Sequence, residues 1–398
     1  MTPRTPGAMT DTPEQLEDLP PGFFKAKLNQ LNAFRQRHEL AEIIIVFVAG
    51  FIFDVATLSR VDDSSTLIQQ GVYLLALSLL MALEQRQKLK GDLPRTAAKV
   101  MEFAEAGIHF FFGALLSTFT LNYFKSGSGL TSLLFVVVVF VLLVANEFPR
   151  FRAYGQIVRF ALLGFCMVSY FACIIPVLVG QVRPWMFVLA VVISSAAMGG
   201  IFYQLNRWNP QKRALLTRSV LPGVGVQVLL LLLYFLKIIP PVPLALTYIG
   251  VYHYVEPPPR GDDRFLTSGL YRLLHERPWW RFWDNGDQTF YARDGDQVYC
   301  FVSVFAPNKF RDRVNIIWSR YNDHRGEWEG QGTVGLQLGG GGAIRESGWR
   351  TFSTKSRYNP GEWRAEAQTE DGRTIGSIRF SIVKDTRTEP RQFVMDLR

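Results

Sequence analysis

Long apolar segments recur through the first two thirds of the chain. Each is close to the roughly 20 residues that a helix needs to cross a hydrocarbon core about 30 Å thick. Residues 133–145, LLFVVVVFVLLVA, are apolar on every side, whereas a soluble helix keeps one polar face. The pattern predicts about seven transmembrane helices, at residues 40–58, 66–83, 102–124, 130–147, 157–180, 184–205 and 219–239.

The pattern changes near residue 256 to short alternating and β-branched runs separated by Asn, Asp and Gly. These runs predict strands at residues 296–305, 313–321, 328–338, 348–357, 362–368 and 374–383. Asp371-Gly372 is typical of a hairpin turn between the last two. We therefore expect an α-helical transmembrane bundle (40–239), a Pro-rich stalk (240–263), and an all-β antiparallel sandwich (264–398), Ig-like or jelly-roll-like.

Basic residues are concentrated in alternate loops. The loops between them hold one basic residue each: Arg60, Lys125 and Arg183. Because cytoplasmic loops retain Lys and Arg during insertion, this pattern predicts a cytoplasmic N-terminus and, after an odd number of spans, an exported C-terminal domain. The cytoplasmic tail of residues 1–39 includes aromatic and basic residues that suit an interfacial amphipathic helix or a solvated lead-in to the first span.

Composition changes this picture little. The chain has 43 Lys and Arg against 34 Asp and Glu, and seven of the nine excess positive charges precede residue 256, so basicity is a topology signal and no nucleic-acid partner is expected. Cys300 is alone in the exported domain, which excludes a disulfide within it. The sequence predicts no cofactor and no metal site.

The candidate functional residues inside the predicted spans are the polar Asp54, Glu105 and His109. Glu105 and His109 are four residues apart on one helical face, as a proton relay or a pair of metal ligands requires. The alternative, which the sequence favours, is structural: Glu105 lies near the cytoplasmic interface, and the pair lacks further His or Cys ligands. Asp54 is explained most simply by pairing with Arg60 near the outer surface.

The exported domain holds one set of candidate ligand-binding residues, on the predicted strands at residues 348–357 and 362–368. Aromatic, cationic and hydroxyl groups there suit a glycan, an acidic polymer or a peptide carboxylate: Trp349, Arg350, Ser353, Lys355 and Trp363. Alternation places Trp349, Ser353 and Lys355 on one strand face. The competing interpretation is a core Phe352 behind an ordinary polar face, with Trp363 capping the core.

A second aromatic group is Trp279, Trp280 and Trp283 in the segment RPWWRFW. These rings form either an interfacial anchor or a ligand platform, and a nearby membrane favours the anchor.

Several of these features together resemble a bacterial envelope domain. The resemblance rests on Trp318 on a middle strand, the segment from Trp349 to Lys355, Pro360-Gly-Glu-Trp363, Asp371-Gly372 and the closing run from Ile378 to Val383. The chain is similar to an uncharacterised bacterial family of polytopic inner-membrane proteins with a C-terminal β-sandwich domain of unknown function. The resemblance implies a bacterial inner-membrane protein with a periplasmic or extracellular sandwich, and no established chemistry.

Catalytic motifs are absent from the exported domain: no G-x-S-x-G occurs, and the glycine run at 339–342 lacks the Lys-Ser/Thr of a P-loop. The sequence therefore favours a membrane-anchored extracytoplasmic binding or assembly module over an enzyme. Its expected partners are the lipid bilayer and an envelope glycan, acidic polymer or protein, with the oligomeric state left open. The rival is a transporter or intramembrane enzyme in which Asp54, Glu105 and His109 line one polar cavity.

Overall fold

The computed structural model describes residues 63–90, 104–147, 155–208, 215–258, 270–307, 310, 312–338 and 348–398. The predicted tail of residues 1–39, the first predicted span and Asp54 lie outside these residues.

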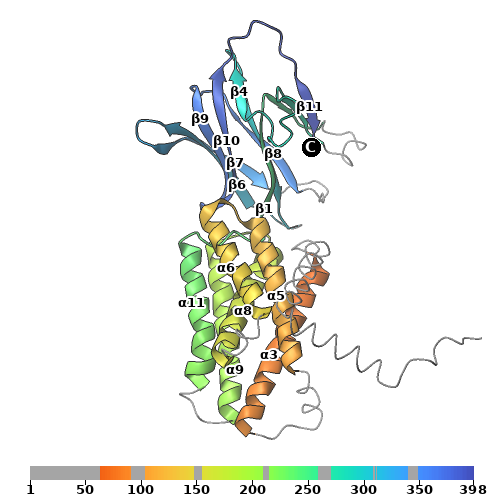
Figure 1. Ribbon diagram of the computed structural model, residues 1–398, viewed down its shortest axis with the longest axis vertical. Coiled ribbons are helices and arrows are strands. Elements are labelled where there is room, and N and C mark those ends of the chain that lie inside the picture. The colour runs from red at the N-terminus through yellow and green to blue at the C-terminus, as the bar shows by residue number, and fades with distance from the viewer. Residues whose placement is uncertain are drawn as a thin grey trace, which may run out of the picture. The chain divides into compact units, whose positions relative to one another are not determined.

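The described helices lie alongside one another in a bundle (Figure 1). They are α3 (Ser64–Lys90), α5 (Ala104–Ser126), α6 (Gly129–Glu147), α8 (Gly155–Val179), α9 (Pro184–Trp208), and the π-helix η1 (Leu216–Val220) that continues into α11 (Leu221–Phe235). Five helical segments are long and apolar enough to cross a membrane, and within α6 the segment Ser132–Val144 is apolar but shorter. The described residues thus support five of the seven predicted spans.

Close approach between helices depends on small residues. Gly164 of α8 faces Gly223 of α11, and a Cβ on either would overlap atoms of the neighbouring helix. Nearby, the Tyr123 hydroxyl of α5 donates to Ser169 Oγ of α8 at 3.1 Å. Small residues let helix backbones pack closely where both surfaces are apolar, so α8 occupies the centre of the bundle.

The C-terminal part is built from β-strands (Figure 1). They are β1 (Ala245–Tyr252), β2 (Tyr254–Glu256), β3 (Arg272–His275), β4 (Thr289–Ala292), β5 (Val298–Phe305), β6 (Asp312–Asn322), β7 (Glu327–Leu338), β8 (Trp349–Lys355), β9 (Gly361–Thr369), β10 (Thr374–Lys384) and β11 (Val394–Leu397). Three sheets result, in the orders β1-β5-β8, β4-β10-β9-β6-β7 and β11-β3-β2.

The sheets β1-β5-β8 and β4-β10-β9-β6-β7 share one core, which makes this part a sandwich. Burial alternates along β9, as expected for a strand with one face inward. Trp318, Trp363 and Phe380 of the five-stranded sheet are in the same buried cluster as Val302 and Cys300 of the other sheet. The expectation of purely antiparallel pairing is wrong at one place, because β4 pairs parallel to β10. A loop leads from β3 into β4, so no hairpin fixes the direction of β4.

The six predicted strands are β5 to β10, and Asp371-Gly372 makes the turn between β9 and β10, with Gly372 at φ +77°. The structure differs where a stalk was predicted over residues 240–263. β1 lies there and pairs with β5 from Ala245↔Phe305 to Tyr252↔Tyr299. The prolines all flank this strand, so the intervening TYIGVY run is able to supply ladder hydrogen bonds.

The loop between α8 and α9 docks into the sandwich. Val182 of this loop belongs to the sandwich core cluster, and its backbone N–H donates to Asp312 Oδ2 at 3.0 Å. Arg183 pairs with Asp312 at 3.3 Å and with Glu370. The sandwich therefore rests directly on the bundle.

A second docking contact centres on Arg373, which is 3% exposed and begins the return from the β9–β10 turn. Its guanidinium lies 4.1 Å from the ring centre of Tyr234 on α11, and its Nη2 donates to the Tyr234 hydroxyl at 2.6 Å. Asp371 pairs with it at 2.7 Å. Phe187 of α9 stacks on the other side of Tyr234, with ring centres 4.1 Å apart.

We predict that Arg373→Met loosens this contact. Removing one member of a buried ion pair costs about 3–5 kcal/mol, so the amides of residues 369–373 should exchange hydrogen much faster. Hydrogen exchange on the full chain in nanodiscs measures this, with Arg313→Met, an exposed position on β6, as the matched control. Unchanged exchange in Arg373→Met would contradict the docking role.

Candidate functional site

A loop of residues 276–288, the tryptophan loop, connects β3 to β4 and is hydrogen-bonded to the end of β1. The Asp287 N–H donates to the Val251 carbonyl at 2.7 Å, and the Val251 N–H donates to the Asn285 carbonyl at 3.2 Å. Gly286 adopts φ +75°, and a Cβ there would overlap the Val251 oxygen. The loop geometry thus requires glycine at this position.

Four aromatic side chains of this loop are exposed. Trp279 is 90% exposed, and more than half of the surface of Trp280, Phe282 and Trp283 is accessible. Aromatic side chains are usually buried, and a group of this size on a surface marks an interaction site.

A cleft of about 480 Å³ lies beside these rings. Trp280, Tyr291 and charged groups of both signs line it: Glu276, Arg277, Arg281, Asp284, Asp287 and Arg387. Arg387 bridges Glu276 at 2.6 Å and Asp385 at 2.8 Å, and its hydrogen bonds to Asp385 hold the pKa of that carboxyl well below its usual range. Arg281 pairs with Asp284 at 2.6 Å. The cleft wall is therefore charged but internally compensated.

Asp287 and His253 form a buried pair under the cleft. His253 Nε2 is 3.7 Å from Asp287 Oδ2, and neither atom has a hydrogen-bond partner among the described residues. Burial raises the pKa of Asp287 to about 7 and lowers the pKa of His253 to about 4. Asp287 Oδ1 accepts from the Glu276 N–H at 2.9 Å. Asp287 is therefore fixed by one carboxyl oxygen, while the other is buried beside His253.

The residues proposed from the sequence as ligand-binding lie elsewhere on the sandwich. Ser353 is 2% exposed and its Oγ accepts from Trp318 Nε1 at 3.1 Å, while Trp363 is 1% exposed and donates to the Asn359 carbonyl at 2.9 Å. Lys355 Nζ donates to the Gln331 carbonyl at 2.6 Å. Trp349 packs against the core, and the Arg350 carbonyl accepts from Tyr271. None of the five lines the cleft beside the exposed tryptophans.

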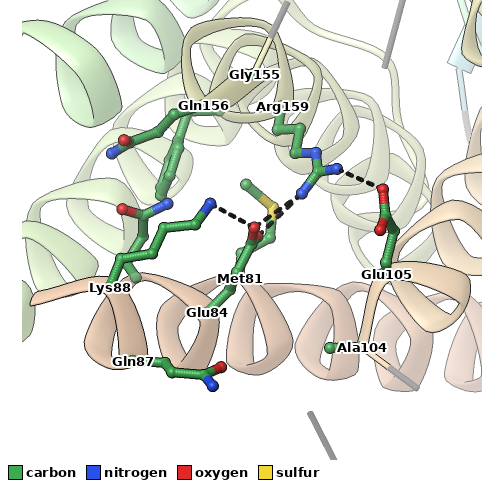
Figure 2. A pocket seen from close by; sticks show the side chains of 11 residues that line it. Met81, Glu84, Gln87, Lys88, Ala104, Glu105, Gly155, Gln156 and Arg159 are labelled. Carbon is green, nitrogen blue, oxygen red and sulfur yellow. Dashed lines mark hydrogen bonds and ion pairs between the residues drawn. The ribbon is translucent and has the colours of Figure 1, made fainter. Parts of the chain in front are cut away.

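A second cavity, of about 330 Å³, lies at the end of the bundle where α3 ends and α5 and α8 begin. Figure 2 shows Glu84, Lys88, Glu105 and Arg159 pointing toward one another across it. Arg159 Nη1 bonds both Glu84 carboxylate oxygens, at 3.0 and 3.1 Å, and Arg159 Nη2 is 3.5 Å from Glu105. Lys88 Nζ is 2.6 Å from Glu84.

This cavity contains one of the three intramembrane polar residues named from the sequence. Glu105 lines it, whereas His109 is absent from its lining and Asp54 is outside the described residues. Among the described residues, no three His, Cys, Asp or Glu side chains are grouped closely enough to ligate a metal ion.

Sequence analysis missed the cleft residues Asp287, Glu276 and Arg387 and the buried His253. His253, Glu276 and Asp287 lie beside β1, β3 and β4, none of which was predicted, and Arg387 reaches them from the end of β10. The sequence feature that pointed to the cleft was the RPWWRFW segment, because loops seldom contain so many aromatic residues.

Comparison with known proteins identifies part of the sandwich. Residues 312–382, which run from β6 to β10, match a family described as a protein of unknown function (DUF2914). No curated protein matches the chain. A solved structure of the Pseudomonas fluorescens alkylpurine DNA glycosylase AlkC, bound to DNA containing an abasic site analog, aligns over 79% of this chain and 98% of its own with 11% identity and a TM-score of 0.18. That score carries no argument about fold or function.

The segment that matches the family includes the residues that dock on the bundle but not those of the cleft. It includes Asp312, Glu370 and Arg373, which dock on the bundle, and it ends before Asp385 and Arg387 of the cleft region. The described chain therefore carries an uncharacterised C-terminal domain whose cleft lies outside the matched segment.

We predict a pH-dependent effect of Asp287→Asn. The raised pKa of Asp287 means that its contribution to stability is full below about pH 4 and is lost as pH rises to about 7, a change on the order of 3 kcal/mol. The Tm of the variant minus that of the parent should therefore increase from pH 4 to 7. Tryptophan fluorescence in nanodiscs measures both, with exposed Asp294→Asn as the control. A difference that does not change with pH would refute the assignment.

We also predict that Gly286→Ala displaces the tryptophan loop, because its Cβ meets Val251. Gly295 provides the control: it has φ +92° but no atom within 4 Å of its Cβ position, so Gly295→Ala incurs the backbone strain alone, about 1 kcal/mol or slightly more. Hydrogen exchange of residues 276–288 should rise in the first variant only. Equal exchange in both would show that the loop does not depend on this contact.

Proposed function

We propose that the protein is a membrane-anchored binding module of the bacterial envelope whose exported sandwich recognises a carbohydrate in the cleft beside the tryptophan loop. The observation that carries the proposal is the group of exposed rings, Trp279, Trp280, Phe282 and Trp283, next to a cleft of about 480 Å³. Small-ligand sites commonly have volumes of about 300–1,000 Å³.

The position of the loop favours a ligand platform over a membrane anchor. β1 begins at Ala245, shortly after α11 ends, and the bridge Val251↔Gly286 joins the loop to the other end of β1. Six residues of extended strand span about 20 Å. The rings therefore lie at the end of β1 away from the bundle, where an interfacial anchor has no membrane beside it.

The chemistry of the cleft favours a largely neutral glycan over an acidic polymer. Three carboxyl groups and three guanidinium groups line it, and Arg281 and Arg387 are already paired with carboxylates. Little positive potential remains for a polyanion. Aromatic faces bind the apolar C–H faces of sugar rings, while paired carboxylates and guanidinium groups accept from and donate to hydroxyls.

The anchoring half of the proposal rests on the five apolar helices and on the loop charges. Lys and Arg in alternate loops support a cytoplasmic N-terminus and an extracytoplasmic sandwich. The transporter alternative required Asp54, Glu105 and His109 to converge on one cavity. Of these three, Glu105 lines the bundle-end cavity, His109 is absent from its lining, and Asp54 lies outside the described residues. The separation of Glu105 from His109 favours the binding module.

A glycan array probed with the full chain in nanodiscs tests this proposal. We expect binding to at least one neutral cell-surface polysaccharide, with Trp280→Ala, which removes the tryptophan ring that lines the cleft, weakening it by about tenfold, the effect of roughly 1.4 kcal/mol at a buried aromatic contact. Trp328→Ala, on β7 and outside the cleft lining, is the control. Absence of binding to every glycan, or equal loss in the control, would contradict carbohydrate recognition.

A further inference from the structure

We propose that the bundle-end cavity binds a phosphoethanolamine group, with Lys88 and Arg159 contacting the phosphate and Glu105 accepting from the primary ammonium. This inference shares with the proposed function only the premise that the bundle spans a membrane. It does not depend on the carbohydrate cleft.

The cavity lies at the depth of lipid headgroups. Arg159 follows the first residue of α8, Gly155, by four positions, and Glu84 precedes the last residue of α3, Lys90, by six. At 1.5 Å per residue their backbones lie about 6–9 Å inside the helix ends. The interfacial layer on each side of a bilayer is roughly 5–7 Å thick, so these charges are near the boundary between headgroups and hydrocarbon.

The cations at this depth retain donors for a phosphate. Arg159 is fixed by its two bonds to Glu84, and a guanidinium has five N–H donors, of which these bonds engage only the Nη1 side. Lys88 is 58% exposed at its side chain, with one contact to Glu84 and three donors. Arg and Lys are the residues that bind phosphate oxygens most effectively.

Glu105 supplies the complementary acceptor. Its side chain is 74% exposed, and its ion pair with Arg159 at 3.5 Å is longer than a hydrogen bond. Figure 2 shows it across the cavity from Lys88, on the far side of Arg159. The cavity therefore offers donors at one side and a carboxylate at the other, while Met81 and Phe160 form buried apolar parts of its wall.

The balance of charge selects among phosphate esters. Among the described residues that line the cavity, two carboxylates face two cations, so a zwitterion leaves them neutral, whereas an anionic headgroup places no cation against Glu105. A choline group has no N–H and cannot donate to a carboxylate. A primary ammonium ester of phosphate satisfies both sides.

Native mass spectrometry of the full chain, with lipids of matched acyl chains, tests the inference. We expect phosphatidylethanolamine to be retained about tenfold more than phosphatidylcholine or phosphatidylglycerol, the effect of one charge-assisted hydrogen bond. Glu105→Gln should abolish that preference, and Lys88→Gln should weaken retention of all three lipids. Lys125→Gln, at the exposed opposite end of α5, should change nothing.

The source of the group is decided by competition with soluble glycerophosphoethanolamine. Failure of this compound to displace the lipid supports a lipid-borne headgroup, and displacement supports a site for the free ester as well. Equal retention of the three lipids by the parent protein, or an unchanged preference in Glu105→Gln, would overturn the inference. Neither result bears on glycan binding by the sandwich.

Discussion

The contact between the β9–β10 turn and α11 depends on one buried guanidinium, that of Arg373. Arg373 has no solvent to stabilise its charge, so Asp371, the Tyr234 hydroxyl and the Tyr234 ring must do so together. Two of these three interactions come from α11 and one from the β9–β10 turn. These three interactions act together only when turn and helix meet, and Arg183 with Asp312 provides a second contact between sandwich and bundle. Docking is thereby specified by charge and aromatic contacts as well as by apolar burial.

The docking contact of Arg373 at the start of β10 also positions the residues that follow the other end of this strand. β10 runs from Thr374, beside Arg373, to Lys384, beside the Asp385 carboxylate that holds Arg387 at the cleft. Eleven residues of strand span roughly 35 Å. β1 begins shortly after α11 ends, and its Val251 forms a β-bridge with Gly286 of the tryptophan loop. Two strands of different sheets therefore link the bundle to the cleft, and the cavity of Glu84 and Arg159 occupies the far end of the same helices.

Periodicity in the sequence predicted the parts of the fold that carry a regular signal. The apolar runs predicted α3, α5, α6, α8, α9 and α11, and alternation predicted β5 to β10. β1 was hidden because neighbouring prolines suggested a stalk, and β3 and β4 are four residues each, too short to show a period. The cleft was missed with them, since Asp287 and Arg387 are 100 positions apart. The predicted set on β8 and β9 remains untested as a ligand site, although packing buries Ser353 and Trp363.

Labelling of intact cells with an impermeant maleimide tests whether the bundle spans the membrane and the sandwich is exported. Ser356 is exposed on the sandwich and Lys88 is exposed at the opposite end of the bundle, while Cys166, Cys173 and Cys300 are buried. In a variant lacking these three cysteines, Ser356→Cys should be labelled and Lys88→Cys protected. Protection of Ser356→Cys with labelling of Lys88→Cys would contradict an exported sandwich, and labelling of both would contradict a bundle that spans the membrane.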